Sequence, residues 1–338
     1  GAAPVGFYPY VGNVYSGGWI ALGAGYRYPV GNTGVIDVEG AYSLRGFWRV
    51  QERVRLPRFS RDRGSLQLRH TTIDASKVKF FGIGPDTVAA NEVQFGLRHT
   101  DLAAELRVAP SDFLTLGADV AYDNWNTREG GSGAPSIETL FSPQSVPGLD
   151  ADPDFVKLRG SVELDWRDAP GYTRRGGYAR ASVTQYRARD NAPHDFTRFD
   201  LAGTQHVPVY RENWVLAFRG LFSATAVSDG NRIPFFLLPM LGESSDELRG
   251  YSTFRFRDRH RLLLTGEYRW MPSHYLDLAL FFDAGVVGPE LGDLEFGAMK
   301  TSWGVSARMH TPTETLLHAT VGRSREGWRI IVGAGQVF

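Results

Sequence analysis

The alternating stretch FVKLRGSVELDWRD, residues 155–168, decides the fold class because its side chains repeat with a period of two. The even-numbered positions are apolar or glycine: Val156, Leu158, Gly160, Val162, Leu164 and Trp166. The odd-numbered positions are almost all charged: Lys157, Arg159, Ser161, Glu163, Asp165 and Arg167. A period of two is that of a β-strand, and a one-sided soluble sheet could carry such a charged face. The density of charge exceeds what the back of a soluble sandwich needs, so the pattern favours a strand between lipid and a polar interior.

The same pattern recurs along the chain, for example in residues 114–123, 274–287 and 301–310, whereas no convincing segment has helical spacing. It predicts sixteen strands, an even number that is typical of bacterial single-chain barrels. Each is about 9–11 residues or longer, as a tilted membrane strand requires. The predicted strands are 5–15, 18–28, 34–45, 47–57, 64–75, 92–108, 112–125, 155–168, 176–189, 194–209, 213–226, 259–271, 274–287, 297–311, 314–323 and 328–338.

Two of the predicted strands are irregular. The first contains Pro9, which has no N–H for a ladder. The strand at 92–108 changes its apolar parity between Leu97 and Leu102, and this change predicts a bulge in that segment.

The lengths of the predicted gaps alternate along the chain. All four long gaps follow odd-numbered strands and therefore lie on one side of the sheet: 76–91, 126–154, 227–258 and 288–296. A barrel with short periplasmic turns and long outer loops predicts this asymmetry, whereas a soluble sandwich does not. The sequence therefore predicts an all-β, sixteen-stranded antiparallel transmembrane barrel, with both ends of the chain on the periplasmic side of the bacterial outer membrane.

Composition excludes several other classes of protein. The 338 residues include no cysteine, which rules out disulfides, thiolate zinc sites and a cysteine nucleophile. The 37 basic and 37 acidic residues balance, so nothing indicates a nucleic-acid partner. No apolar run is long enough for a spanning helix. The opening GAAPVGFYPY shows no signal peptide and fits either a mature end or a shortened start.

Motifs for catalysis and metal binding are also missing from the sequence. None of the eight histidines has a metal-ligand spacing, and the small-residue segment at 130–136 lacks the context of a serine nucleophile. The carboxylate pairs Asp119/Asp123 and Glu163/Asp165 are the residues best suited to acid–base work. Paired lumen charges are common in barrels, so we expect no enzyme activity, no metal and no cofactor.

The segment ELRGYSTFRFRDRHRLLLTGEYRW, residues 247–270, runs from the long gap at 227–258 into the twelfth predicted strand. By itself it fits either a functional site or an ordinary arginine–glycine turn in a solvated loop. With its surroundings, the sequence resembles the outer-membrane barrel superfamily that contains BamA, TamA and the two-partner secretion transporters such as FhaC. The resemblance is most specific in IPFFLLPMLGESSDELRGY (233–251), GEYRW and FFDAG, and it extends to KFFGIGPD (79–86) and LDWRDAPGYTRRGG (164–177).

This resemblance implies a sixth outer loop that folds into the lumen and carries a four-residue motif. The motif residues here are Leu248, Arg249, Gly250 and Tyr251. In the family, the motif arginine contacts acidic residues on strands twelve and thirteen, which correspond to Glu267 and Asp283. The period-two pattern independently places both of these side chains in the lumen, and a planar guanidinium suits carboxylates.

The resemblance also implies a function, namely insertion or translocation of proteins at the outer membrane. We expect a weak seam between the first and last strands, because Pro9, Gly333 and Gly335 weaken a ladder. The terminal Phe338 is similar to the insertion signal of outer-membrane barrels. A passive pore or a structural membrane subunit is the alternative, and a lipid-modifying enzyme is the least favoured.

The expected partners follow from the same resemblance. They are outer-membrane lipid and client outer-membrane or secreted proteins. The family members named above carry periplasmic polypeptide-transport-associated domains before the barrel. The first predicted strand here begins within the first few residues, so either such domains lie outside this sequence or the protein is a barrel-only member. For a barrel-only member we expect a single barrel domain over 1–338 and a separate periplasmic partner.

Overall fold

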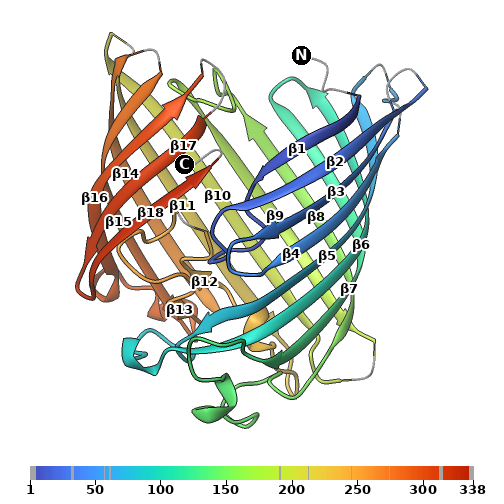
Figure 1. Ribbon diagram of the computed structural model, residues 1–338, viewed down its shortest axis with the longest axis vertical. Coiled ribbons are helices and arrows are strands. Elements are labelled where there is room, and N and C mark those ends of the chain that lie inside the picture. Colours follow the sequence, from blue (N-terminus) through green and yellow to red (C-terminus); the bar gives the residue numbers. More distant parts are fainter. Residues whose placement is uncertain are drawn as a thin grey trace.

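The chain forms one sixteen-stranded antiparallel sheet that is rolled into a barrel (Figure 1). The computed structural model describes residues 5–31, 34–56, 58–60, 62–189, 192–211, 213–244, 246–273, 275–311 and 315–334. The barrel strands are β1 (Gly6–Gly12), β2 (Ala21–Val30), β3 (Gly34–Ser43), β4 (Trp48–Arg55), β5 (Gly64–Phe80), β6 (Val93–Ser111), β7 (Leu114–Glu129), β8 (Asp154–Asp165), β9 (Gly176–Ala188), β10 (Phe196–Tyr210), β11 (Trp214–Val227), β14 (His260–Ser273), β15 (Leu276–Gly288), β16 (Lys300–His310), β17 (Thr315–Ser324) and β18 (Gly327–Ala334). The predicted fold class and strand number are confirmed.

The long connections lie together at one end of the barrel, which we call the loop end, and the opposite end is the turn end (Figure 1). The longest connection, which we call the inner loop, is residues 228–259 between β11 and β14. It contains a short hairpin of β12 (Met240–Leu241) and β13 (Phe256–Arg257). Among the described residues of the connections, the 3-10 turns are η1 (Ala89–Asn91), η2 (Ile137–Thr139), η3 (Phe235–Leu237), η4 (Leu291–Asp293) and η5 (Phe296–Ala298). In the part of the chain described, no helix is long and apolar enough to cross a membrane.

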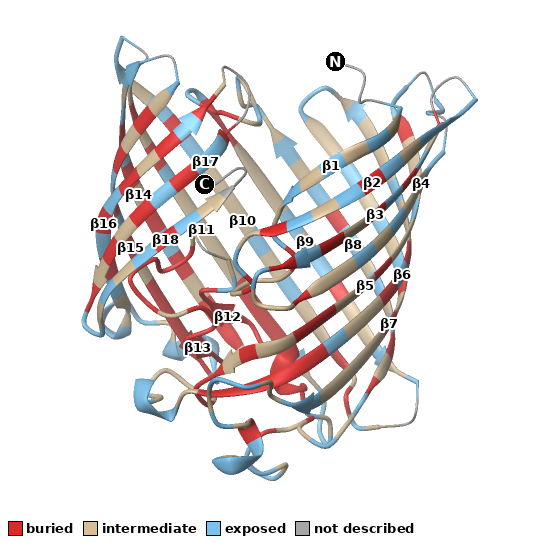
Figure 2. Ribbon diagram, in the orientation of Figure 1, coloured by how far each residue is buried: buried red, intermediate tan, exposed pale blue. Residues whose placement is uncertain are grey.

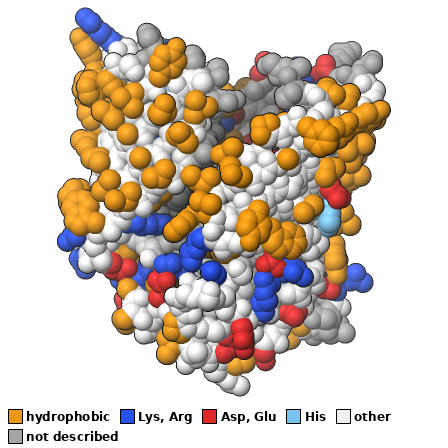
Figure 3. Space-filling model, in the orientation of Figure 1, with side chains coloured by type: hydrophobic (Ala, Val, Ile, Leu, Met, Phe, Trp, Pro, Cys, Tyr) orange, Lys and Arg blue, Asp and Glu red, His pale blue; other side chains and the backbone are white. Residues whose placement is uncertain are grey.

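Side chains alternate between the outside and the lumen as the sequence predicts. On β8, the exposed outward residues include Val156, Leu158 and Val162, while the intervening charges point inward. Inward Arg159 and Lys157 pair with carboxylates on β7, at 2.9 Å and 2.8 Å. Figure 3 shows hydrophobic side chains over the wall and charges gathered toward the loop end. The dense charge on the inward face of β8 is therefore satisfied by cross-strand ion pairs inside the barrel.

An apolar core fills the lumen at the loop end, where buried residues gather in Figure 2. The inner loop contributes Phe235, Phe236, Leu237, Leu238, Met240 and Phe254 to it. The wall contributes inward residues of β5 and β6, namely Phe80, Val93, Phe95 and Leu97. Phe235 packs edge-to-face on Phe80 and Phe95, with ring centroids 5.2 Å and 4.8 Å apart. Burial of these aromatic rings offsets the conformational entropy that the backbone of the inner loop loses when the loop is ordered.

The bulge predicted in strand 92–108 is wrong. The ladders of β6 run without a register shift from Leu97 to Leu102 on both sides. Register shifts lie instead on β5 between Ala75 and Val78, and on β6 between Val108 and Ser111. Between Leu97 and Leu102 the apolar parity changes because the inward positions of β6 become apolar where they meet the core of the inner loop, not because the strand gains a residue there.

Candidate functional site

The predicted motif forms a tight turn inside the barrel. The Tyr251 N–H donates to the Leu248 carbonyl at 2.9 Å, so Arg249 and Gly250 occupy the two central positions. Leu248 has a φ of 45°, a left-handed conformation that costs a branched residue about 1–2 kcal/mol. Its side chain is buried in an apolar cluster with Tyr251, Leu241, Phe256, Leu263 and Val287. Burial of the leucine and tyrosine therefore holds a strained backbone in place.

Glycine is required at Gly250 by the closeness of the wall. A Cβ added there would lie 2.7 Å from both the Arg323 carbonyl carbon and Ser302 Cβ. Across the contact, a Cβ on Gly322 of β17 would lie 2.8 Å from the Arg249 carbonyl oxygen. The Gly250 carbonyl accepts from Ser324 Oγ at 2.7 Å. The turn is thus pressed backbone-to-backbone against β16 and β17.

Arg249 makes ion pairs with both predicted acidic residues. Its Nη2 and Nε donate to the two oxygens of Asp283 at 2.8 Å and 3.1 Å, and its backbone N–H donates to Asp283 Oδ2 at 2.9 Å. Its Nη1 donates to Glu267 Oε1. The guanidinium lies over the ring of Phe281, 3.6 Å from the centroid. The side chains of all three ionic partners are at most 3% exposed.

Neighbouring wall residues complete the hydrogen bonds of the two carboxylates. Asp283 accepts from Thr265 Oγ1 and Ser302 Oγ, each at 3.1 Å. Glu267 Oε2 accepts from Arg269 Nε at 2.8 Å and Arg308 Nη2 at 2.6 Å. Buried ionic groups are stable only when such partners satisfy them. Burial alone lowers the pKa of Arg249, but Glu267 and Asp283 outweigh it and raise that pKa above its ordinary value. We call this cluster the anchor.

Comparison with known proteins identifies the family of this chain. Residues 65–319 match the Omp85 superfamily domain. The chain belongs to the Omp85 superfamily. A search of curated protein sequences finds no match to it. Its fold places the protein in the bacterial outer membrane, and the recognised resemblance to BamA-like barrels is confirmed.

Solved structures of BamA and CdiB share the fold at low sequence identity. BamA from Haemophilus ducreyi lacking POTRA domains 1–3 superposes with a TM-score of 0.71 at 14% identity, over 98% of this chain and 69% of that one. CdiB from Escherichia coli gives 0.63 at 11% identity, over 99% and 64%. CdiB from Acinetobacter baumannii gives 0.56 at 11% identity, over 98% and 59%. The chain thus spans about two thirds of the length of these structures.

Several arginines around the motif, which the sequence left without a role, also hold the inner loop of this Omp85 barrel. Arg255 Nε donates to Glu326 in the β17–β18 connection at 2.9 Å, and its Nη atoms donate to Thr87 Oγ1 and carbonyl at 2.6 Å. Buried Arg257 donates to the carbonyls of Phe235 and Lys79, at 3.3 Å and 3.2 Å. In the sequence, these arginines are visible only as dense positive charge at the end of the inner loop. Their partners could not be predicted because most of them are distant in sequence.

The anchor also connects to the turn end of the barrel. Arg308 lies between Glu267 and Asp277, 2.6 Å and 3.9 Å from their oxygens. Asp277 accepts from the hydroxyl of Tyr172 at 3.1 Å. Tyr172 lies in the β8–β9 turn and stacks on His310 of β16, with centroids 3.8 Å apart. This turn therefore reaches across the lumen, a contact that the LDWRDAPGYTRRGG segment did not reveal.

The strands expected to form the seam, β1 and β18, lie at the two edges of the sheet (Figure 1). Among the described residues they share no hydrogen-bonded ladder, although parts of the two strands come within 8 Å of each other, Cα to Cα. Pro9 pairs with Ala24 of β2, and Gly333 pairs with His318 of β17. Gly335 and Phe338 lie outside the described residues. The seam thus coincides with a break in the sheet.

The inner loop contacts elements on both sides of this break. On one side, Arg329 of β18 donates from Nη1 to the Tyr251 carbonyl and from Nη2 to Thr253 Oγ1 at 2.9 Å. On the other side, Ser16 of the β1–β2 connection donates to the Glu243 carbonyl. The motif and its neighbours therefore bridge the break from within the lumen.

The rejected catalytic candidates are used in wall ion pairs. Asp119 and Asp123 pair with Arg159 and Lys157, while Arg107 contacts Glu163 at 2.8 Å. Within the described ranges, no group of three or more His, Asp or Glu residues is arranged to hold a metal ion.

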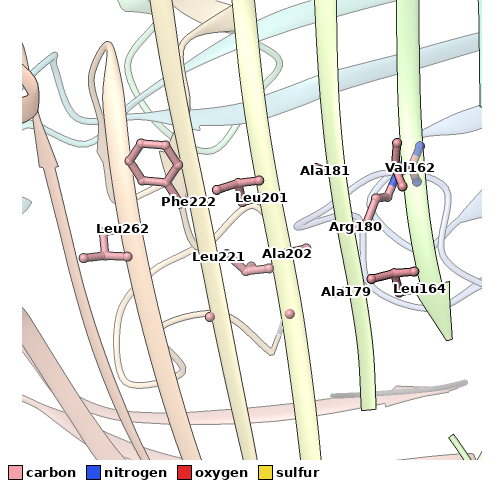
Figure 4. A pocket seen from close by; sticks show the side chains of 12 residues that line it. Val162, Leu164, Ala179, Arg180, Ala181, Leu201, Ala202, Leu221, Phe222 and Leu262 are labelled. Atoms are coloured by element: carbon pink, nitrogen blue, oxygen red, sulfur yellow. The ribbon is translucent and has the colours of Figure 1, made fainter. Parts of the chain in front are cut away.

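A separate recess of about 400 Å³ lies on the outer face across β8–β11 (Figure 4). It arises where small residues, such as Ala179, Ala181 and Gly203, lie between bulky ones. Its apolar lining suits lipid contact and does not adjoin the anchor.

Proposed function

We propose that this Omp85 barrel assists the insertion or translocation of client proteins at the outer membrane by offering the edges of β1 and β18. The observation that carries the proposal is the missing ladder between these strands in the described residues of an otherwise continuous sheet. A strand edge with unpaired backbone groups is a template for another strand. In hydrocarbon, unpaired N–H and C=O groups are costly, so such an edge has a strong drive to gain a partner.

The anchor has a defined part in this mechanism. It fixes the inner loop on β14 and β15 through Arg249, and the same loop holds β18 through Arg329. The loop thereby sets where the β18 edge lies relative to β1. We infer that the anchor keeps the seam ready for a client strand while the rest of the barrel stays rigid.

The interior argues against a wide passive pore. The inner loop and its apolar core occupy the lumen at the loop end, with Phe235 and Leu241 fully buried. A large steady conductance through the barrel would contradict this arrangement. We also propose that the loop end faces outward and that β1 begins and β18 ends at the periplasmic turn end, where a separate periplasmic partner delivers clients.

A reversible lock of the seam tests the proposal. The chain has no cysteine, so Phe7→Cys on β1 and Ile330→Cys on β18 can be joined by a bifunctional thiol reagent with a reducible linker. Purified protein in lipid vesicles is then supplied with an unfolded outer-membrane barrel, and folding of that client is followed by heat-modifiable migration. We expect locking to abolish assisted folding and reduction to restore it.

A matched control pair lies away from the seam. Val162→Cys on β8 and Ala181→Cys on β9 occupy paired positions within the continuous sheet. Linking them should leave client folding unchanged. Full activity with the seam locked would refute the proposed role of these edges.

A further inference from the structure

An acid–base pair lies on the outward face of the barrel. Glu52 of β4 and His70 of β5 stand opposite each other in the ladder, and His70 Nδ1 lies 3.4 Å from Glu52 Oε2. The two side chains remain 54% and 39% exposed. The contact uses one nitrogen and one oxygen, so His70 Nε2 and Glu52 Oε1 lie outside it.

The register shows that this pair belongs to the apolar outer surface. The ladder row through it runs from Tyr26 and Val38, through Glu52 and His70, to Leu102. The three flanking members of that row are large, exposed hydrophobic residues. Side chains on one face of a sheet follow such rows, so Glu52 and His70 share the face of their apolar neighbours.

Neighbours along the two strands are also mostly apolar. Val50 and Val54 flank Glu52 on β4, and Leu68 precedes His70 on the same face of β5. By contrast, the outward arginines Arg98 and Arg128 lie toward the loop end and share the carboxylate of Asp74. We call Glu52, His70 and their apolar neighbours Val38, Val50, Val54, Leu68 and Leu102 the outer polar patch.

Acyl chains are a poor environment for this patch. Ionisable side chains on the lipid-facing surface of a barrel are destabilising and in membranes generally find a polar partner. The internal pair satisfies only part of the capacity of each group. A protein surface that supplies both a donor and an acceptor would satisfy the remainder.

We propose that the outer polar patch is the centre of a twofold contact between two copies of this chain in the membrane. An acid beside a hydrogen-bond donor is self-complementary about a twofold axis, because Glu52 of one copy then faces His70 of the other in both directions. The surrounding valine and leucine side chains supply the apolar rim. In the sheet order, β4 and β5 are separated from β1 by β2 and β3, so the contact leaves the seam free.

Cysteine crosslinking in vesicles of phosphatidylethanolamine and phosphatidylglycerol tests the location of the contact. Val54→Cys lies in the patch. The matched control is Leu158→Cys, because the Leu158 side chain faces outward from β8, away from the patch. With a short bifunctional thiol reagent, we expect at least about tenfold more dimer from the first variant than from the second. Equal yields from the two positions would overturn the proposal.

An exchange of charges tests the twofold pairing itself. In the Val54→Cys background, Glu52→His leaves two histidines in the patch and His70→Glu leaves two carboxylates, so neither variant is self-complementary. Each alone should lose about tenfold in dimer yield. A mixture of the two is complementary in both contacts and should regain the dimer, as should the double exchange. The internal pair stays broken in each single variant, so only contact between copies explains recovery in the mixture.

Heat-modifiable migration checks that each variant folds, and Glu52→Leu with His70→Leu provides a second, apolar variant of similar size that has no hydrogen-bonding side chains at the two positions. That variant should fold and lose the dimer. Undiminished dimer in the single exchanges, no recovery in the mixture, or crosslinking only to a different envelope protein would each overturn a contact between two copies.

Discussion

Replacing Arg249 with alanine is expected to undock the inner loop. The guanidinium, Glu267 and Asp283 are all buried, and removal of one partner from such a pair costs about 3–5 kcal/mol. The structure shows how that cost divides. Glu267 keeps Arg269 and Arg308, whereas Asp283 keeps only hydroxyl donors and the backbone N–H of residue 249. Most of the penalty therefore arises at Asp283.

Urea unfolding of the purified barrel in detergent, followed by tryptophan fluorescence, measures the loss in the free energy of unfolding. Limited proteolysis of the inner loop reports local undocking. Asp283→Asn in the Arg249→Ala background should recover about 1 kcal/mol, because it removes the uncompensated charge. Arg249→Lys should be little more stable than Arg249→Ala, since an ammonium lacks the planar fork that contacts both carboxylates. A change below about 0.5 kcal/mol for Arg249→Ala, with unchanged proteolysis, would refute the anchoring role.

Three further predictions concern the same region. Gly250→Ala should displace the motif from β16 and β17 and expose the inner loop to protease, whereas Gly203→Ala, whose added Cβ meets its nearest atom at 3.9 Å, should change stability by less than about 0.5 kcal/mol. Burial raises the pKa of Glu247 to about 7 from 4.5, so the folded state holds this proton more tightly than the unfolded state. The free energy of unfolding, measured by urea titration, should therefore fall as the pH rises from about 4.5 to 7. Glu247→Gln should remove that part of the fall, and a variant with the same pH profile as the unaltered protein would contradict the assignment. Tyr172→Phe should cost about 1.5–3 kcal/mol through its lost bond to Asp277, while the outward Tyr268→Phe should be nearly neutral; equal effects in urea would exclude the strut across the lumen.

The period-two pattern predicts most of the barrel because each strand separates two solvents of opposite polarity. Strand number, loop parity and the inward direction of Glu267 and Asp283 all follow from that single constraint. The pattern fails where the lumen stops being polar. Leu97 faces inward against the apolar core of the inner loop, so its parity does not distinguish a bulge from a packed interior.

The candidate site was predictable only in part for a similar reason. Family resemblance gives the motif and its two carboxylates, which lie on adjacent strands. The contacts of Arg255 with Thr87 and Glu326 join segments that are far apart in sequence, and no local pattern encodes them. The same holds for Tyr172, whose partner Asp277 lies across the barrel.

These long-range contacts give the anchor a wider role than holding one loop. From Arg249, the ionic path runs through Glu267 and Arg308 to Asp277, and then to Tyr172 in a turn at the opposite end of the barrel. The inner loop that carries Arg249 also touches both sides of the break between β1 and β18. A continuous set of polar contacts thus connects the turn end to the seam. Such a network transmits a change from one end to the other only if it has two stable arrangements. If the seam opens for a client, the Tyr172–Asp277 bond and the docking of the inner loop should weaken together. A double-mutant cycle between Tyr172→Phe and Arg249→Ala measures this coupling: strict additivity of their effects on client folding would show that the two ends of the lumen act independently.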